Sequence, residues 1–346
     1  MKPVRLLLVL ALTALTTLTA ACGGASATPD SGPASRLSLG YFANVTHAGP
    51  VYGVASGIYA KELGTTKLKT QTFNAGPAAV EALFAGAIDA AYLGPGPAVN
   101  AFLKSKGDVV VVAGATSGGA SLVVKPEITD VSQLKGKKIA DPQTGGTQDI
   151  ALRTYLKGAG YTEDAQGGGD VTIVAQENAQ SLDAFKSGDI DGAWVPEPWA
   201  SRLVLEGKGT VLVDEKSLWP DGKFITTNLL VKRSYLTAHP DTVKALLTAQ
   251  VEADKQINAD PANAQVVVNA ALKELTGKSL KPDVIARAFQ QITVGEDPLA
   301  ATLKTAAEHA FDTGLVKKGD LTGIYDLTLL NEVLGRTVDD AGLGKG

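Results

Sequence analysis

Residues 138–152 read KIADPQTGGTQDIAL and combine a short apolar strand, a glycine turn and the start of a helix. Gly145 and Gly146 allow positive φ and close approach of the backbone, and Thr144 or Thr147 can cap the helix that follows. The first turn of such a helix presents free backbone N–H groups and the positive end of the helix dipole. The pattern therefore predicts a seat for an anion or a polar head group, with an ordinary capped turn as the alternative.

The N-terminus has the pattern of a secretory signal peptide. Residues 1–21 begin with two basic residues, continue through an apolar run at 6–18 and end in small residues directly before Cys22. The apolar run is about 13 residues long, too short for a membrane-spanning helix of roughly 20. Cys22 is the only cysteine, which excludes an intramolecular disulfide, and its position resembles a bacterial lipobox. We expect Cys22 to be acylated, with a simply cleaved signal as the alternative, and residues 22–35 to form a flexible tether.

Composition limits the possible classes of function. The chain has 32 basic and 36 acidic residues, and these are scattered, so the sequence offers no basic stripe for nucleic acid. The 38 glycines fit an α/β protein with many tight turns between strands and helices. From residue 36 onward the length suits about two domains.

An internal echo indicates two similar halves. Residues 86–93 read GAIDAAYL, and residues 188–195 read GDIDGAWV. Each segment is followed by a turn rich in proline, at 94–97 and at 196–198. We interpret the echo as two lobes of similar build, and the alternative is two unrelated units that share common α/β patterning.

Three segments together resemble a known family. They are GYFANVTHA at residues 40–48, TGGTQD at 144–149 and GAWVPEPW at 192–199. In combination they are similar to the extracytoplasmic solute-binding proteins of ABC importers, and most of all to the branch that binds nitrate, taurine and aliphatic sulfonates. The resemblance implies an α/β, two-lobed fold of the type II periplasmic-binding kind, with two crossover strands and one ligand closed in the cleft.

The resemblance also implies a domain organisation and a function. Lobe one would comprise residues 36–122 plus 228–346, and lobe two residues 123–227, with one copy of the echo in each lobe. The protein would be a lipid-anchored component of an importer that captures a small anion, such as an aliphatic sulfonate or taurine, and delivers it to a membrane permease. We expect a monomer outside the cytoplasm, attached to the cell membrane through its lipid, with no cofactor and no metal. Nitrate, bicarbonate and a thiamine-precursor pyrimidine are the alternative ligands.

The expected site consists of neutral hydrogen-bond donors. A sulfonate or nitrate has a delocalised charge and accepts several hydrogen bonds, so rigid neutral donors suit it without a full countercharge. Turns from opposite lobes that close on one anion would make binding and closure the same event. The candidate ligand-binding residues in these turns are Asn44, Thr46, His47, Gly94, Gly96, Ser117, Gly118, Gly119, Gly146, Thr147 and Gln148.

Trp194 and Glu197 are two further candidates. Trp194 can wall the cleft against an alkyl tail or belong to the core, because most tryptophans are largely buried. Glu197 lies between two prolines, and its carboxylate repels an anion unless the ligand also carries an amine, as taurine does. The other interpretation of Glu197 is that it only orients the local backbone.

The sequence gives no support for catalysis. It contains no GxSxG and no HExxH, and residues 138–152 contain neither GxGxxG nor the Gly-Lys-Ser/Thr that closes a phosphate-binding loop. We therefore expect no catalytic residue and no enzyme activity. The alternative from a different class is a pyrimidine-precursor synthase of the same fold, which would need a histidine in the cleft, and His47 is the one that qualifies.

Overall fold

The computed structural model describes residues 32–344. The predicted signal peptide, Cys22 and most of the predicted tether lie outside the described residues. The end of the tether differs from the flexible segment that we expected, because Ala34 is buried, donates its N–H to Thr242 Oγ1 at 2.8 Å and accepts from Thr66 Oγ1 at 2.6 Å. The chain is thus tied to the fold before its first strand begins.

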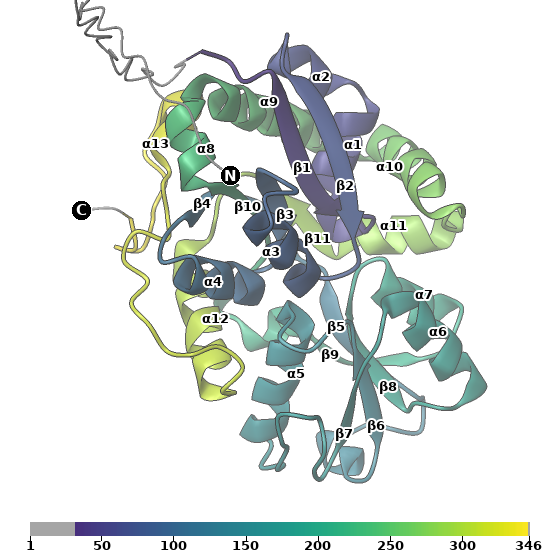
Figure 1. Cartoon of the computed structure of the whole chain (residues 1–346). Coiled ribbons are helices and arrows are strands. Elements are labelled where there is room, and N and C mark those ends of the chain that lie inside the picture. The colour runs from purple at the N-terminus through teal and green to yellow at the C-terminus, as the bar shows by residue number, and fades with distance from the viewer. Residues whose placement is uncertain (1–31, 345–346) are drawn as a thin grey trace, which may run out of the picture.

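Two β-sheets form the centres of two lobes (Figure 1). The strands of the first sheet, in spatial order, are β11 (Ile292–Val294), β4 (Val109–Gly118), β10 (Ile225–Lys232), β3 (Ala90–Leu93), β1 (Arg36–Phe42) and β2 (Lys67–Phe73). The strands of the second sheet, in spatial order, are β7 (Thr172–Ala175), β6 (Lys138–Asp141), β8 (Gly192–Pro196), β5 (Ala120–Val124) and β9 (Thr210–Asp214).

The two sheets share one plan. In the first, β1 pairs in parallel with β2 and β3, while β10 runs antiparallel between β3 and β4. In the second, β6 pairs in parallel with β7 and β8, while β5 runs antiparallel between β8 and β9. The two echo segments of the sequence thus supply equivalent strands, β3 and β8. This arrangement is the two-lobed α/β fold that the sequence predicts.

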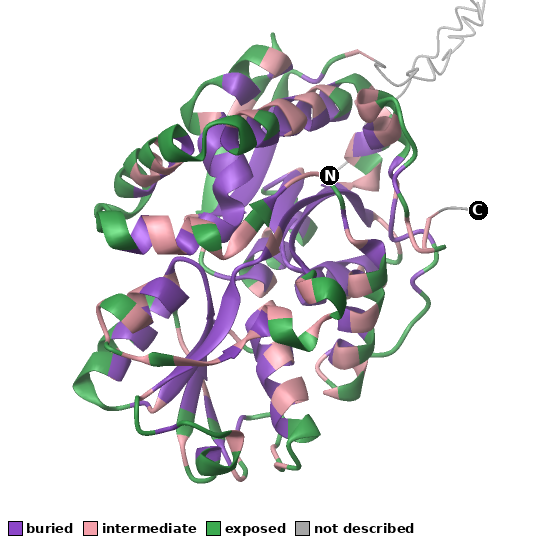
Figure 2. Cartoon of the chain, turned by 180° about the vertical axis from the view of Figure 1, so that it is seen from behind, coloured by how far each residue is buried: buried purple, intermediate pink, exposed green. Residues whose placement is uncertain are grey.

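Helices cover both sheets, and buried residues follow the strands through both lobes (Figure 2). On β5, Leu122 and Val124 pack into one apolar cluster and Val123 into another, as the alternation of a strand buried on both faces requires. The α-helices are α1 (Ala48–Ala55), α2 (Ile58–Leu63), α3 (Gly76–Phe84), α4 (Pro95–Lys104), α5 (Thr147–Gly158), α6 (Asn178–Ser187), α7 (Trp199–Leu205), α8 (Arg233–Ala238), α9 (Pro240–Ala259), α10 (Pro261–Thr276), α11 (Pro282–Gln290), α12 (Ala300–Asp312) and α13 (Thr328–Leu334). The 3₁₀ segments are η1 (Val45–His47), η2 (Val131–Leu134), η3 (Glu215–Leu218) and η4 (Pro220–Gly222).

The chain passes between the sheets at two places. Strands β4 and β5 meet at Gly119, and both Gly118 and Gly119 have positive φ, 77° and 79°, which glycine adopts most readily. The return passes through η3 and η4 into β10. The boundary drawn from the sequence after Leu122 falls inside β5, which pairs only within the second sheet, and the boundary at Asn228 falls inside β10, which pairs only within the first. The limits of the lobes therefore stay a prediction.

Candidate ligand-binding site

A hollow of about 30 Å³ lies between the two lobes, where loops that follow strands of both sheets meet. A single water needs roughly 10–15 Å³ measured in this way, so the hollow suits a compact group such as the head of an oxyanion. Seven of the thirteen ligand-binding candidates from the sequence belong to its wall. The lining residues are Phe42, Asn44, Thr46, His47, Asn74, Ala75, Gly76, Gly94, Pro142, Gly146, Thr147, Gln148, Asn178, Pro196, Thr226 and Thr227.

The loop after β1 supplies Asn44 and Thr46, which are both buried. Lobe two holds the backbone of this loop, because the N–H groups of Val45 and Thr46 both donate to the carbonyl of Glu197, at 3.1 and 3.3 Å. Asn44 Oδ1 accepts from Trp199 Nε1 at 2.9 Å. The amide nitrogen of Asn44 therefore keeps its two N–H donors for a solute.

His47 lies against Phe42 in the wall of the hollow, with the two rings 4.3 Å apart. Its Nδ1 accepts the backbone N–H of Phe42 at 3.3 Å, so in the neutral ring the proton is on Nε2. Burial lowers the pKa of His47 to about 3. His47 is thus a neutral donor at physiological pH and brings no positive charge to the hollow.

The start of α5 supplies Gly146, Thr147 and Gln148 from lobe two. The residue at the N-cap is Gly146, without a side-chain cap, so the prediction that Thr144 or Thr147 caps this helix is wrong. A helix start leaves several backbone N–H groups without intrahelical partners, and here they stand at the wall of the hollow. The dipole of this 12-residue helix adds partial positive charge at the same end.

The start of α4 meets the start of α5 across the cleft. A side chain at Gly94 would overlap Thr147 Oγ1, and one at Gly96 would overlap Ile150 Cδ1. Glycine at these two positions therefore allows the lobes to come together. Asn74 Nδ2 also donates across the cleft to Glu177 Oε1, at 2.6 Å. These contacts describe the closed arrangement of the lobes.

The hollow contains no fixed positive charge. Within residues 32–344 no lysine or arginine lines it, and His47 is its one ionisable residue. Asp141 lies directly before the lining residue Pro142 and is completely buried. Burial, reinforced by the negative charge of Asp149, raises the pKa of Asp141 to about 8. A neutral Asp141 at pH 7 does not repel an anion in the hollow.

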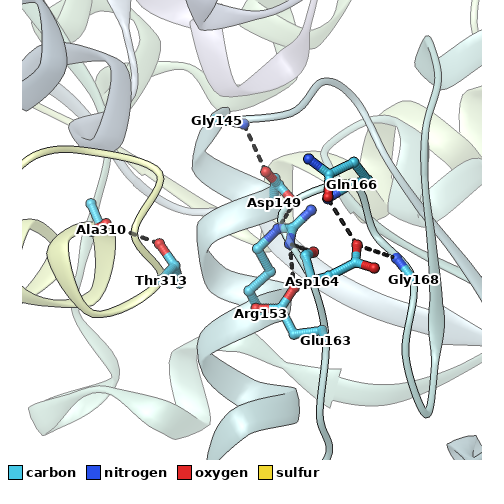
Figure 3. Close-up of polar contacts among 9 residues, drawn as sticks. All are labelled: Gly145, Asp149, Arg153, Glu163, Asp164, Gln166, Gly168, Ala310 and Thr313. Atoms are coloured by element: carbon cyan, nitrogen blue, oxygen red, sulfur yellow. Dashed lines mark hydrogen bonds and ion pairs between the residues drawn. The ribbon is translucent and has the colours of Figure 1, made fainter.

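A buried ion cluster behind the hollow fixes the first turns of α5 (Figure 3). Asp149 Oδ2 accepts the backbone N–H of Gly145 at 2.7 Å, and its Oδ1 accepts from Arg153 Nε at 2.6 Å. Arg153 Nη1 also pairs with Glu163 and donates to the carbonyl of Asp164 at 2.8 Å. Because all these groups belong to lobe two, the cluster positions the turn before α5 without contact to the other lobe.

Four glycine or hydroxyl candidates lie outside the wall of the hollow. Gly96 lines a neighbouring cavity instead. Ser117 and Gly118 belong to β4, where they pair with β10 and β11. A side chain at Gly119 would meet Ile292, Thr46 and Glu197, so this glycine serves the close packing of the crossover.

Trp194 is completely buried and packs in the core of lobe two, 5.6 Å from Tyr155. Its Nε1 donates to Glu215 Oε2 at 2.8 Å. Of the two interpretations of Trp194, the structure agrees with the core residue, because its side chain does not line the hollow.

Glu197 lies at the junction of the lobes. Its side chain is buried, its Oε2 accepts from the N–H of Ser201 at 3.1 Å, and its Oε1 lies 3.7 Å from Arg287 Nη1. Burial raises its pKa, while the hydrogen bond from Ser201 and the charge of Arg287 oppose that shift. Together with the carbonyl that binds the loop after β1, these contacts make Glu197 a link between the lobes.

Several polar residues of the hollow were missed from the sequence. Thr226 Oγ1 donates to the carbonyl of Gly118 at 2.5 Å, and Thr227 Oγ1 to that of Thr46 at 3.0 Å. Asn178 begins α6, and its Oδ1 is buried without a hydrogen-bond partner among the described residues. The same strand-turn-helix signal that marks α5 also precedes Asn178, whereas nothing local distinguishes the two threonines inside β10.

Metal binding and membrane spanning find no support in residues 32–344. These residues contain no group of three or more His, Cys, Asp or Glu side chains that could hold a metal ion. Over the same range, no helix has the length and apolar character needed to cross a membrane.

Residues 30–272 match the NMT1-like family. Among curated proteins, the chain is similar to the taurine-binding periplasmic protein of Escherichia coli K12, with 31% identity over 208 residues. This match covers 60% of the chain and 62% of the relative, so the chain spans under two thirds of that relative's length. The relative is named as a binding protein and not as an enzyme.

Two solved structures have the same fold. The alkanesulfonate-binding protein SsuA of Xanthomonas axonopodis pv. citri, bound to MOPS, is 24% identical with a TM-score of 0.67, covering 82% of this chain and 95% of that one. The periplasmic nitrate-binding protein NrtA of Synechocystis PCC 6803 is 19% identical with a TM-score of 0.74, covering 87% and 88%. At these identities the likeness concerns the fold alone.

Proposed function

The chain belongs to the NMT1-like family, and we propose that it is the solute-binding component of an ABC importer that captures a small oxyanion, a sulfonate above all, between its lobes. The observation that carries the proposal is the hollow lined by neutral donors from both lobes. The anion of a strong acid, such as a sulfonate, stays deprotonated at physiological pH. Its binding site therefore needs hydrogen-bond donors and no group that accepts a proton. The names of the taurine-binding and alkanesulfonate-binding relatives agree with this chemistry.

In the proposed complex the two lobes hold the anion together. Lobe one contributes the amide of Asn44, the hydroxyl of Thr46 and the Nε2–H of His47, and lobe two contributes the first turn of α5 with Thr147 and Gln148. The carbonyl of Glu197 in lobe two also binds the backbone of the loop after β1, so closure of the lobes adds to the contacts that hold the donors of lobe one. Closure would thus create the complete set of donors, and the closed form would be the one that a permease recognises.

We further propose that Cys22 anchors the mature protein to the outer surface of the cell membrane. The support is the position of this single cysteine directly after a signal-peptide pattern. Cys22→Ser should release the protein from the membrane fraction, and a variant that stays membrane-bound would contradict the anchor.

A thermal-shift panel tests the function. Protein that lacks residues 1–22 is mixed with alkanesulfonates, taurine, nitrate, bicarbonate and pyrimidines. A ligand at about 100 times its dissociation constant should stabilise the protein by roughly 2.7 kcal/mol. A shift with a pyrimidine and with none of the anions would overturn the proposal.

A double variant tests the site. Thr147→Ala with Gln148→Ala should abolish the anion-dependent shift, because both side chains line the hollow. The matched control is Thr144→Ala, a threonine of the same turn that is exposed and does not line the hollow. Retained affinity in the double variant would remove these two residues from the site.

A further inference from the structure

Trp199, the first residue of α7, reaches from lobe two to a residue of lobe one that lines the hollow. Its Nε1 donates to Asn44 Oδ1 at 2.9 Å. Asn44 directly precedes η1, and its side chain does not cap that segment. Within residues 32–344, the bond from Trp199 is therefore the hydrogen bond that holds the side chain of Asn44.

This bond decides which way the amide of Asn44 points. An amide side chain has two orientations of similar shape, which exchange the places of its oxygen and its nitrogen. The indole N–H of Trp199 can only donate, so the Asn44 atom that faces it must be the oxygen. The two N–H groups of the amide then remain for the hollow, whose wall includes Asn44.

Trp199 has its own supports and does not line the hollow. The guanidinium of Arg202, one turn further along α7, lies 4.8 Å from the centre of its ring, an attractive arrangement of a cation and an aromatic face. Arg202 is itself paired with Glu206 at 3.1 Å. The half-buried ring also lines a separate cavity together with Leu182 and Leu272. Trp199 can therefore act on a solute only through Asn44.

We propose that Trp199 is a positioning residue that sets the specificity of the hollow: it directs the N–H groups of Asn44 toward the solute, so that the closed protein selects a head group that carries only hydrogen-bond acceptors. This inference rests on the proposed function, because it concerns the same hollow. Without Trp199, the oxygen of Asn44 could turn to accept from a solute. With Trp199 in place, a solute N–H would meet the N–H groups of Asn44, and donors left without acceptors are unfavourable.

A double-mutant cycle tests whether Trp199 acts through Asn44. Protein that lacks residues 1–22 is titrated calorimetrically with methanesulfonate. Trp199→Phe keeps an aromatic ring and removes the N–H, so affinity should fall roughly fivefold, as expected for one lost hydrogen bond. In an Asn44→Ala background the same substitution should change affinity by no more than about twofold, because the group that it positions is absent. Equal losses in the two backgrounds would overturn the inference.

Thr147→Ala provides the matched control background. Thr147 also lines the hollow, but the N–H of Trp199 is given to Asn44 and not to Thr147. Trp199→Phe should therefore still cost roughly fivefold in affinity when Thr147 is alanine. If the loss disappeared in this background as well, the effect of Trp199 would not pass specifically through Asn44. Thermal unfolding without ligand verifies that each variant is folded.

Methanesulfonamide gives a second readout, which a purely structural role would not change. It has nearly the shape of methanesulfonate, but a neutral NH₂ donor replaces one anionic oxygen. The ratio of the two affinities should fall at least roughly fivefold in Trp199→Phe, because the freed amide of Asn44 can accept from this NH₂ group.

The outcomes separate the inference from the proposed function. If Trp199→Phe weakened both ligands by the same factor, Trp199 would only stabilise the closed form, and the inference would be wrong while the proposed function stood. If the parent protein did not bind methanesulfonate, the proposed function would be wrong and the inference with it.

Discussion

Buried carboxyl groups lie near two opposite faces of α5, and their surroundings differ. On one face Asp149 and Arg153 form an ion pair that Glu163 extends. The other face carries Ala151, which lines two neighbouring cavities together with Glu215. Successive helical residues turn by about 100°, so positions 149 and 151 point in nearly opposite directions.

The difference between these faces lies in what accompanies each carboxyl group. Asp149 has a guanidinium 2.6 Å away, whereas Glu215 accepts the neutral indole N–H of Trp194 at 2.8 Å. A buried carboxylate without a cation favours its protonated form, and the raised pKa of Glu215 follows from that burial. The paired face therefore fixes the helix, whereas the other face lies near a carboxyl group whose pKa is raised by burial.

The largest effect should come from breaking the ion cluster. Arg153→Met keeps the length of the side chain but leaves Asp149 and Glu163 without their cation, although the side chain of Asp149 is fully buried. Removal of one partner of a buried pair costs about 3–5 kcal/mol of unfolding free energy. Urea denaturation measures this loss, and the released Gly145 turn should also weaken anion binding.

The control is Arg336→Met, which removes an arginine that pairs with Glu296 at 2.9 Å but has 54% of its side chain exposed. An exposed pair contributes about 0–1 kcal/mol, so this variant should unfold almost like the parent protein. Equal losses in the two variants would mean that burial does not set the contribution of these arginines.

A smaller effect is expected from Glu215→Gln, and its sign depends on pH. Burial raises the pKa of Glu215 from 4.5 to about 7, so the folded protein binds this proton more tightly than the unfolded chain does. The resulting stability is complete below pH 4.5 and is lost as the pH rises through 7. Glutamine cannot ionise, so the variant should be more stable than the parent at pH 8, by up to on the order of 3 kcal/mol, and similar at pH 4.5.

Denaturation of both proteins from pH 4.5 to 8 measures this difference. The pKa of Asp141 is also raised by burial, so ionisation of Asp141 lowers the stability of both proteins as the pH rises. Only the difference between the variant and the parent therefore reports on Glu215. Glu332→Gln, at a half-exposed carboxylate paired with Lys244, is the matched control and should show no gain at high pH. If the unfolding free energies of Glu215→Gln and the parent changed in parallel with pH, Glu215 would not be a buried carboxyl group whose ionisation lowers stability.

The general architecture could be predicted from the sequence because it depends on patterns within short segments of the chain. Strand, glycine turn and helix start follow one another at residues 138–152, and the echo at 86–93 and 188–195 gives β3 and β8, which hold equivalent places in the two sheets. The same local signal predicted that Thr147 and Gln148 face a ligand, and both line the hollow. The prediction was possible because backbone donors at a helix start depend on only a few consecutive residues.

The remainder of the site depends on contacts between distant parts of the chain. A turn such as 117–119 contains glycine and a hydroxyl whether it binds a ligand or, as here, allows a crossover to pack closely, so sequence cannot separate the two uses. Thr226 and Thr227 look like ordinary strand residues, and only their pairing with other segments brings them to the hollow. Glu197 was ambiguous for the same reason, since its partners Ser201 and Arg287 come from different parts of the chain.

The smallest effect should come from the exposed end of the same helix. Lys157 Nζ donates across the cleft to the carbonyl of Asp312 at 3.1 Å, near the end of α12. This contact resembles the one that Arg153 makes to a carbonyl, but Lys157 is exposed, so water can replace its partner when the contact is lost. Lys157→Met should therefore change the unfolding free energy by less than about 0.5 kcal/mol. Anion affinity should change by no more than roughly twofold, because the same small energy limits what the contact adds to closure. A loss near that of Arg153→Met, measured in the same urea denaturation, would show that the link between α5 and α12 and not the buried cluster holds this helix in place.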